Sequence, residues 1–291
     1  MRGKLMMNES MSKHTTWRVG GPADHYYIPA DLHDLADYLQ SLPMDEPVTW
    51  IGLGSNLLVR DGGVRGTVIA TSGALKSLSV TNDNLVRAEA GVASAKVARY
   101  TVDQGFTGAE FLAGIPGTIG GALAMNAGAF GGETWNIVES VETIDRQGVV
   151  HRRSAAEFVV SYRHVAIPEG EWFVAGYFHL PRASTGNEGK AEIKSLLSRR
   201  GASQPMQTAN AGSVFKNPKN NYAARLIESC NLKGVCEGKA CVSEVHANFI
   251  INTGGASARD IEVLIERIRQ QVRQQTGVEL EPEVRMTGEP L

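Results

Sequence analysis

The stretch from Gly108 to Gly132 limits the possible fold more than any other part of this sequence. Its 25 residues include eight glycines, six alanines and one charged side chain, Glu110. Glycine adds no side chain to a core and loses more conformational entropy on folding than other residues, so such a run favours a place where another group approaches the backbone closely. The run alone leaves two interpretations open: a surface that receives a large cofactor, and a tightly packed junction of helix and strand.

Composition narrows the class of protein. A chain of 291 residues fits two domains or one domain with an insertion, and 42% hydrophobic with 21% charged residues is typical of a globular protein. The formal net charge of -2 gives no sign of nucleic acid or an anionic membrane as a partner. The N-terminus has no signal-peptide core, and no segment approaches the roughly 18 apolar residues of a membrane span. We therefore expect a cytoplasmic protein that binds neither nucleic acid nor membrane.

The spacing of cysteine and histidine argues against a metal site. Cys230, Cys236 and Cys241 are odd in number and form no CxxC pair, so we expect reduced, structural thiols rather than a disulfide framework or a zinc site. His246 has no second ligand at metal-binding spacing, and we expect it to be structural. The sequence therefore predicts no metal.

Local periodicity and turn residues predict an α+β chain. The first part is expected to contain helices over 31–42 and 94–104, strands over 48–53, 67–71 and 172–180, and hairpins over 78–92 and 138–152. The loop 181–187 is rich in turn-forming residues and is the predicted domain boundary. The second part is expected to contain helices over 190–200, 222–229 and 259–276 and an apolar run over 247–252. The last helix has Ser257 and Asp260 as a predicted N-terminal cap and Gly277 as its stop.

A second glycine-rich segment, Gly52 to Leu57, follows a predicted strand. Its sequence lets successive backbone N–H groups turn inward and bind an anion, although an ordinary β-turn has the same composition. It is not a Walker loop, because no Gly-Lys follows, and it is not the GxGxxG fingerprint, because Leu57 replaces the last glycine. Together with the run from Gly108 to Gly132, it favours a dinucleotide held between two glycine-rich segments.

Several motifs resemble those of the UDP-N-acetylenolpyruvoylglucosamine reductase (MurB) family. They occur in the family's order and cover nearly the whole chain, which makes the set specific although each motif alone is not. The motifs are Thr16 to Ala23 (TWRVGGPA), Gly54 to Leu57 (GSNL), Gly114 to Gly121 (GIPGTIGG), Asn126 to Ala129 (NAGA), Tyr162-Arg163, Gly212 to Pro218 (GSVFKNP), His246 to Phe249 (HANF) and Leu280 to Arg285 (LEPEVR).

The resemblance implies an α+β fold with a two-part FAD-binding region of the vanillyl-alcohol-oxidase type. This region is expected over 1–184, with its two subdomains split near residue 72, and an α+β substrate-binding domain is expected over 185–291. The tail 278–291 is expected to pack back onto the first region. The loop from Gly52 to Arg60 contains no histidine, so FAD is expected to bind non-covalently.

The resemblance also implies which residues bind FAD. Its pyrophosphate is expected on the backbone of Gly54, Ser55 and Asn56, and the run from Gly108 to Gly132 is expected to be a flavin-side wall rather than a phosphate loop or a core helix. A bulky substitution at Gly120 or Gly121 should then release FAD and leave the protein folded. The residues expected to bind FAD are Gly52, Gly54, Ser55, Asn56, Leu57, Gly114, Pro116, Gly117, Thr118, Gly120, Gly121, Asn126 and Gly128.

The family's reaction reduces an enolpyruvyl double bond. By resemblance, NADPH reduces FAD and leaves, and UDP-N-acetylglucosamine enolpyruvate then takes its place. Addition of hydride creates negative charge beside the substrate carboxylate, and this enolate must be stabilised and protonated. The resemblance assigns proton donation to Ser213 and stabilisation of the enolate to Arg163 and Glu283. Without the resemblance, a turn serine and two surface charges are the ordinary interpretation.

Residues of the same motifs are expected to contact the nucleotide sugar, although a solvated face is the commoner reason for lysines. These residues are Tyr162, Lys216, Asn217, Lys233 and Arg285. Glu281 competes with Glu283 for the catalytic role, because both would lie on one face of a strand. The position directly before Val284-Arg285 favours Glu283.

The chain departs from the common family pattern in two places. His164-Val165 follow Arg163 where the family usually has a small hydroxyl residue at the second position, which leaves a contact there in doubt. About 50 residues separate Arg163 from Ser213, as in the shorter family type, so we expect no inserted tyrosine lid. Two other functions remain open: a flavin oxidase or dehydrogenase of an alcohol or lactone, and a non-catalytic flavin or nucleotide-sugar binding protein.

Overall fold

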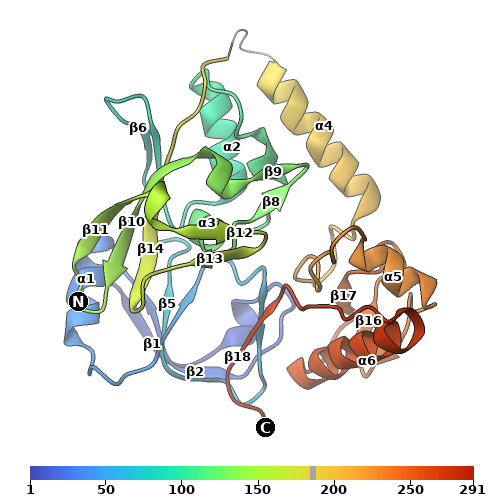
Figure 1. The fold of residues 1–291 in the computed structure, drawn as a ribbon. Helices are drawn as coiled ribbons and strands as arrows, with labels where there is room; N and C mark the ends of the chain where they lie inside the picture. The colour runs from blue at the N-terminus through green and yellow to red at the C-terminus, as the bar shows by residue number, and fades with distance from the viewer. Residues whose placement is uncertain (184–187) are drawn as a thin grey trace. The chain divides into compact units, whose positions relative to one another are not determined.

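The structure, a computed structural model, describes residues 1–183 and 188–291 (Figure 1). They form two compact units, each built from separated segments of the chain. Unit 1 contains Met1–Met6, Tyr26–Leu53 and Thr67–Arg200, and unit 2 contains Met7–His25, Gly54–Gly66 and Gly201–Leu291. The boundary expected between 184 and 185 lies outside the described residues.

Unit 1 is built on a five-stranded antiparallel sheet of order β11-β10-β14-β7-β6 (Figure 1). Its strands are β6 (Leu78–Val80), β7 (Val86–Glu89), β10 (Val138–Asp145), β11 (Val150–Ser154) and β14 (Glu171–Phe178). Both predicted hairpins and the strand predicted over 172–180 are therefore confirmed.

A second sheet has the order β1-β2-β5-β3. Its strands are β1 (Lys4–Ser10), β2 (Pro22–Ile28), β3 (Val48–Ile51) and β5 (Val64–Ala70), and β3 and β5 are parallel. The sequence predicted the last two but not the short β4 (Leu57–Val59) between them. The helix predicted over 31–42 is confirmed as α1 (Leu32–Ser41), which begins where the Asp31 side chain accepts a hydrogen bond from the Asp34 N–H at 2.9 Å.

The glycine-rich run from Gly108 to Gly132 contains several short elements. They are η2 (Glu110–Gly114), α3 (Ile119–Met125), β8 (Gly128–Ala129) and the start of β9 (Gly132–Glu133). The expectation that this run contains no core helix is wrong, because α3 buries Ile119, Ala122 and Leu123 and packs against β14 and β7. These three residues share one helical face, so even a glycine-rich helix has an apolar stripe to bury.

The remaining elements of unit 1 connect these layers. They are α2 (Ser94–Asp103), η3 (Thr134–Ile137), η4 (Ala155–Glu157), β12 (Val159–Ser161), β13 (His164–Ala166) and α4 (Glu188–Ser203), which continues past Arg200 into unit 2. The helices predicted over 94–104 and 190–200 are confirmed. Over the described ranges, no helix is both long enough and apolar enough to span a lipid bilayer.

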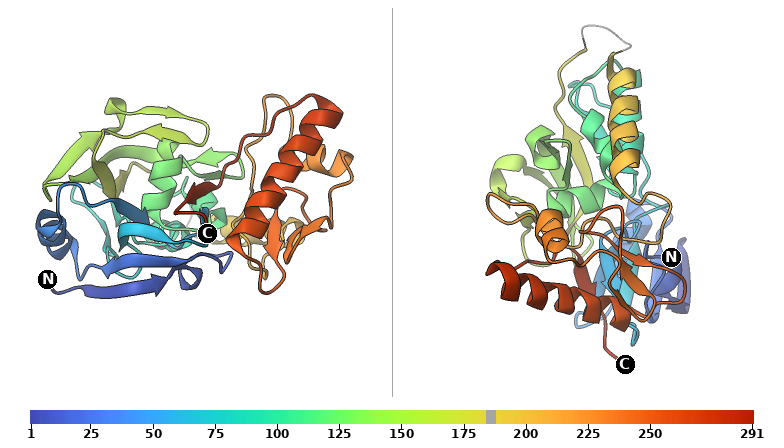
Figure 2. Two further views of the ribbon diagram at one scale, coloured as in Figure 1. Left: turned by 90° about the horizontal axis from the view of Figure 1, so that it is seen from below. Right: turned by 90° about the vertical axis from the view of Figure 1, so that its right-hand side faces the viewer.

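Unit 2 packs α6 against the antiparallel sheet β15-β16-β17, and α5 packs against α6 (Figure 2). Its elements are η1 (Met11–Lys13), β4, α5 (Ala223–Ser229), β15 (Cys236–Glu237), β16 (Ala240–Val242), β17 (Ile250–Asn252), α6 (Ala258–Thr276) and β18 (Arg285–Thr287). The cap predicted for α6 is confirmed, because Ser257 and Asp260 form a reciprocal capping box and Gly277 ends the helix with φ 73°.

The core of unit 2 combines residues that lie far apart in the sequence. Trp17, Leu58, Phe215 and Ile265 belong to one buried cluster. The C-terminal tail contributes β18, which pairs in parallel with β4 so that Arg285 lies opposite Leu57. The N-terminal segments of unit 2 are therefore part of the same core as its C-terminal segment.

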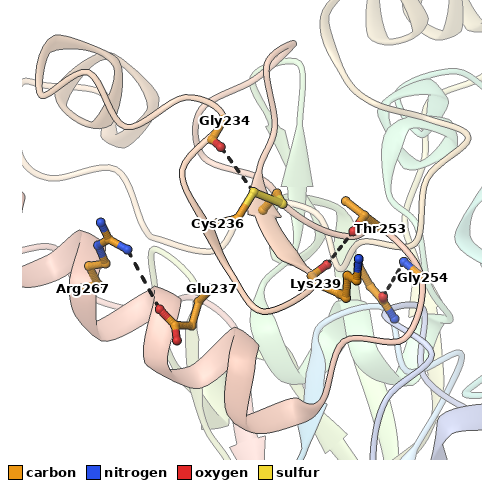
Figure 3. The surroundings of a disulfide bond; sticks show 9 residues. Gly234, Cys236, Glu237, Lys239, Thr253, Gly254 and Arg267 are labelled. Atoms are coloured by element: carbon orange, nitrogen blue, oxygen red, sulfur yellow. Dashed lines mark hydrogen bonds and ion pairs between the residues drawn. A yellow bond between two sulfur atoms is a disulfide. The ribbon is translucent and has the colours of Figure 1, made fainter.

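A disulfide joins Cys236 to Cys241 across the β15-β16 hairpin, with Cα atoms 4.1 Å apart (Figure 3). The expectation of three reduced thiols is therefore wrong at these two positions. The sequence contains no CxxC pair, but the hairpin makes the two cysteines direct cross-strand partners. Cys230 is a buried free thiol.

Candidate active site

The two glycine-rich segments meet inside unit 1 at Gly52 and Thr118. A Cβ atom added to Gly52 would lie 2.3 Å from Thr118 Oγ1, so a side chain does not fit beside this hydroxyl. Thr118 is 1% exposed, and its Oγ1 has no hydrogen-bond partner among the described residues. A buried hydroxyl without a partner is costly. Gly52 and Thr118 therefore fit a place where a bound group such as FAD supplies the missing hydrogen bond.

The backbone that follows Thr118 is bonded to protein. The Ile119 N–H donates to Val92 O at 2.8 Å, and the Gly120 N–H donates to Ala90 O at 2.9 Å. These bonds hold the start of α3 against the connection between β7 and α2. The N–H groups of Ile119 and Gly120 are thus not available to bind a phosphate. The FAD contacts expected of this segment remain predictions, and they would have to involve other atoms.

The rest of the first glycine-rich turn belongs to unit 2. Gly54 has φ +61°, and a Cβ atom there would lie 2.1 Å from His14 O, so this position requires glycine on both grounds. Asn56 Nδ2 donates to the Glu283 carbonyl at 3.0 Å, and Asn56 O accepts from the Arg285 N–H at 3.0 Å. The turn expected to bind FAD therefore contacts the segment expected to supply a catalytic carboxylate.

Ser213 and Glu283 are brought together by the backbone of unit 2. Ser213 follows Gly212, which has φ +75°, and is partly exposed. The next residue, Val214, accepts a hydrogen bond from the Glu283 N–H at 2.8 Å. Glu283 is also partly exposed. Ser213 and Glu283 therefore lie on neighbouring segments, and their catalytic roles remain predictions.

Asn248, which the sequence did not single out, fixes the Ser213 segment. Its carbonyl accepts from the Val214 N–H at 2.9 Å. Its side chain accepts from the Phe215 N–H at 3.0 Å and donates to the Phe215 carbonyl at 2.8 Å. Asn248 is 3% exposed, and the sequence signal that could have found it is an amide among apolar neighbours in a family motif.

The two competing carboxylates, Glu281 and Glu283, differ in environment. Glu281 pairs with Lys216, with Nζ 2.5 Å from Oε1, and its side chain is 70% exposed. No strand forms over 281–283, where Phe215 and Pro282 make an isolated antiparallel bridge. The exposure of Glu281 favours Glu283 as the residue that meets a substrate.

The residues expected to contact the nucleotide sugar lie in both units. In unit 2, Asn217 Oδ1 accepts from the Ala223 N–H at 3.0 Å at the start of α5, and Lys233 pairs with Glu228 at 2.7 Å. Lys216 pairs with Glu281, and Arg285 lies opposite Leu57 at the start of β18. In unit 1, Tyr162 is 44% exposed. Contact of these five residues with the sugar remains a prediction.

Arg163 occupies a two-residue turn of unit 1, between β12 and β13. It has φ +56°, which is rare for arginine. Its Nη1 donates to Asn126 O at 3.3 Å and its Nη2 donates to Gly128 O at 3.1 Å. The guanidinium is therefore oriented by the carbonyl of Asn126, at the end of α3, and by the carbonyl of Gly128, in β8, contacts that the sequence did not predict.

His246 has the contacts of a structural histidine. Its Nδ1 accepts from the Asn248 N–H at 3.3 Å, and its ring packs on Phe249 with centroids 4.8 Å apart. Burial lowers the pKa of His246, which favours the neutral ring. Within the described part of the chain, no cluster of three or more His, Cys, Asp and Glu side chains could hold a metal ion.

Comparison with known proteins gives the family. One family model, described as "FAD binding domain", matches residues 23–154, and another, described as "UDP-N-acetylenolpyruvoylglucosamine reductase, C-terminal domain", matches residues 204–287. The chain is 56% identical to the UDP-N-acetylenolpyruvoylglucosamine reductase of Alkalilimnicola ehrlichii over 99% of this chain and 96% of that protein. It is 54% identical to the reductase of the same name from Methylococcus capsulatus, over 99% and 94%.

A solved structure agrees with this result. The UDP-N-acetylenolpyruvylglucosamine reductase (MurB) of Thermus caldophilus matches with a TM-score of 0.83 at 31% identity, and the match covers 98% of this chain and 99% of that one. The predicted α+β fold with an FAD-binding region is thereby confirmed. The chain belongs to the UDP-N-acetylenolpyruvoylglucosamine reductase (MurB) family.

Proposed function

We propose that this protein reduces UDP-N-acetylglucosamine enolpyruvate to UDP-N-acetylmuramate, with NADPH as the hydride donor, in the synthesis of peptidoglycan precursors. The observation that carries the proposal is identity above 50% to enzymes named for this reaction, over 99% of the chain. The reaction takes place in the cytoplasm, where NADPH and nucleotide sugars are available.

FAD, when bound, accepts hydride from NADPH and supplies hydride to the enolpyruvyl group. The backbone of Gly54, Ser55 and Asn56 would bind its pyrophosphate, and Thr118 Oγ1 would donate one hydrogen bond to it. No histidine lies between Gly52 and Arg60 to tether it, which supports non-covalent binding.

Ser213 supplies the proton in this proposal. Hydride adds to the methylene carbon of the enolpyruvyl group, and the electron pair of the double bond moves to the neighbouring carbon and its carboxylate. The Ser213 hydroxyl gives its proton to that neighbouring carbon and regains one from solvent. Gly212 and the hydrogen bonds of Val214 hold the turn that presents this hydroxyl.

Arg163 and Glu283 stabilise the enolate. Two parallel N–H donors of a guanidinium match the two oxygens of a carboxylate, so Arg163 would bind the carboxylate on which charge develops. A protonated Glu283 carboxyl group would donate a hydrogen bond to the enolate oxygen. The contact between Glu283 and the Ser213 segment supports a shared role for these two residues.

An anaerobic experiment tests the proposal. The purified yellow protein is mixed with NADPH, and UDP-N-acetylglucosamine enolpyruvate is added after the flavin absorbance has bleached. We expect the substrate to restore the colour and UDP-N-acetylmuramate to form. If only oxygen restores the colour, the protein is a flavin oxidase. If NADPH causes no bleaching, it is a binding protein.

The variant Ser213→Ala tests the assigned proton donor. It should bleach with NADPH at the normal rate but regain colour roughly a hundredfold more slowly, because general acid catalysis is worth at least that much. Equal slowing of both steps would contradict the role given to Ser213.

A further inference from the structure

Arg163 needs support from its surroundings to hold its conformation. A left-handed backbone is unfavourable for a residue with a side chain, and such residues persist where neighbouring groups determine the turn. Arg163 has φ +56° at the second position of its turn. The turn is short, since Ser161 and His164 on either side of it are already paired in β12 and β13.

Asn126 contacts both the backbone of this turn and the guanidinium. Its side-chain Nδ2 donates to Ser161 O at 3.2 Å, directly before the turn. Its own carbonyl accepts from Arg163 Nη1 at 3.3 Å. Asn126 is 2% exposed and ends α3 in a left-handed conformation, with φ 43° and ψ 52°. One residue therefore fixes the position of Arg163 in two ways.

Glu133 and Trp135 determine the orientation of the Asn126 amide. Nδ2 gives its second hydrogen to Glu133 Oε2 at 2.9 Å, and Oδ1 accepts from the Trp135 N–H at 3.1 Å. The reversed amide would set its oxygen against a carboxylate and a carbonyl, which all lack hydrogens. The surrounding groups therefore accept one orientation, and every hydrogen-bonding atom of the side chain is used.

Gly128 is matched to the same arrangement. Its carbonyl accepts from Arg163 Nη2 at 3.1 Å, and a Cβ atom at this position would lie 2.5 Å from Gly132 O and 3.1 Å from Arg163 Nη1. Asn126 and Gly128, both expected from the sequence to bind FAD, thus have contacts with Arg163 in the structure.

We propose that Asn126, oriented by Glu133, is a positioning residue for Arg163 and thereby sets how well the protein binds the carboxylate of its substrate. The inference rests on the proposed function, because it needs Arg163 to meet that carboxylate. It assigns Asn126 and Glu133 a task in substrate recognition in addition to any contact with FAD.

The test compares two nucleotide sugars that differ in the group that Arg163 would bind. UDP-N-acetylmuramate has a lactyl carboxylate, and UDP-N-acetylglucosamine lacks it. In calorimetric titrations of the holoenzyme, Asn126→Asp should weaken binding of UDP-N-acetylmuramate by roughly tenfold, as expected for a displaced charge-assisted contact, and change binding of UDP-N-acetylglucosamine by less than about twofold. The aspartate side chain has the shape of asparagine, but it replaces the donor Nδ2 with an oxygen. That oxygen would repel Glu133 Oε2 and Ser161 O, which accept from Nδ2 in the native protein.

A second variant separates positioning from damage to the fold. Glu133→Gln keeps an acceptor for Asn126 and should bind both ligands nearly as the native protein does. In the double variant Asn126→Asp/Glu133→Gln, the amide introduced at position 133 can donate to the carboxylate introduced at position 126, so part of the lost UDP-N-acetylmuramate affinity should return. If Asn126→Asp does not fold, Asn126→Gly keeps the left-handed backbone, removes the bond to Ser161 O and should show the same selective loss.

Asn252→Asp is the matched control. Asn252 in unit 2 also donates to one carbonyl, of Trp17 at 2.9 Å, and accepts from two N–H groups, of Gly254 and Ala256. This variant should lower the melting temperature without changing the ratio of the two affinities.

Two results would overturn the inference: equal loss of both ligands in Asn126→Asp, or native affinity for UDP-N-acetylmuramate in a folded Asn126→Asp protein. A native protein that binds neither nucleotide sugar would instead contradict the proposed function.

Discussion

Single polar residues in this protein take their roles from the backbone around them. Glu281 and Glu283 are two positions apart, yet Glu281 pairs with Lys216 at the surface and Glu283 lies where Asn56 and Val214 meet. Spacing could not separate them, because residues two positions apart would lie on the same face of a strand. The motif order favours Glu283, and the fold adds that Glu283 is less exposed than Glu281.

The two glutamates provide a matched pair of variants. Glu283→Gln should slow substrate-dependent reoxidation of the flavin by roughly a hundredfold, the usual loss of a positioned acid, and should leave bleaching by NADPH intact. Glu281→Gln should stay within about twofold of the native rate in both steps, because exposed ion pairs contribute little. Stopped-flow absorbance measures both steps, and the opposite ranking would assign the role to Glu281.

Asp34 shows how a buried carboxylate is stabilised in unit 1. It is 1% exposed and accepts hydrogen bonds from Tyr27 Oη at 2.6 Å and the Ala30 N–H at 2.9 Å. Burial by itself would raise the pKa of Asp34, but these hydrogen bonds outweigh it and lower the pKa from 3.8 to about 2. The ionised form therefore stabilises the fold.

Asp34→Asn should lower the free energy of unfolding by about 2 kcal/mol at neutral pH. Because the folded pKa is depressed, the full contribution is present above the ordinary value of 3.8 and is lost as the pH falls toward 2. The gap between native and variant protein in urea titrations should thus be constant from about pH 7 to 5 and shrink at about pH 3. Asp37→Asn, on the same helix but exposed, should cost less than about 0.5 kcal/mol.

Helices and strands whose determinants lie within their own residues were predicted from the sequence, whereas those that depend on distant partners were not. Helix α6 has its cap, its stop and an apolar face within its own residues, so it was predicted nearly to the residue. Strand β4 has only Leu57 to Val59, and its partner β18 lies 228 positions later, from 57 to 285. A prediction from local sequence patterns cannot detect a pairing between strands so far apart. The disulfide hairpin was missed for a related reason, since pairing depends on a turn that spacing alone does not show.

Gly120 and Gly121 in α3 differ in the space around them, so substitutions at the two positions should have different effects. A Cβ atom on Gly120 would lie 2.9 Å from Ala90 Cβ, whereas one on Gly121 would meet no atom within 4 Å. Gly120→Val should therefore lower the melting temperature of the whole protein. Gly121→Val should keep the circular dichroism spectrum and lose FAD, measured by absorbance after gel filtration. Full retention of FAD by Gly121→Val would remove this position from the flavin wall.

At the scale of the whole molecule, each unit is discontinuous in sequence. Trp17, Val19 and Leu58 are at most 3% exposed within the core of unit 2, although most of that unit follows Gly201. Chain length left open two domains or one domain with an insertion. It could not show which distant segments share a core, because that depends on contacts between residues that no local pattern links.

The fragment 201–291 should consequently not fold alone. Without the N-terminal segments it lacks Trp17 and Leu58, each 0% exposed in the full chain, and the partner of β18. Its amide NMR spectrum should be poorly dispersed, and its urea unfolding should lack a cooperative transition. A well-dispersed spectrum would show that this segment is an independent domain.

The pairing of β4 with β18 also matters while the protein is being made. Leu57 of β4 is synthesised 228 residues before Arg285, its partner in β18. The core around Trp17 and Leu58 therefore stays incomplete until later residues of that core, such as Phe215 and Ile265, have been synthesised. During that interval the nascent chain exposes apolar surface, and we expect it to depend on chaperones until these later segments have been made.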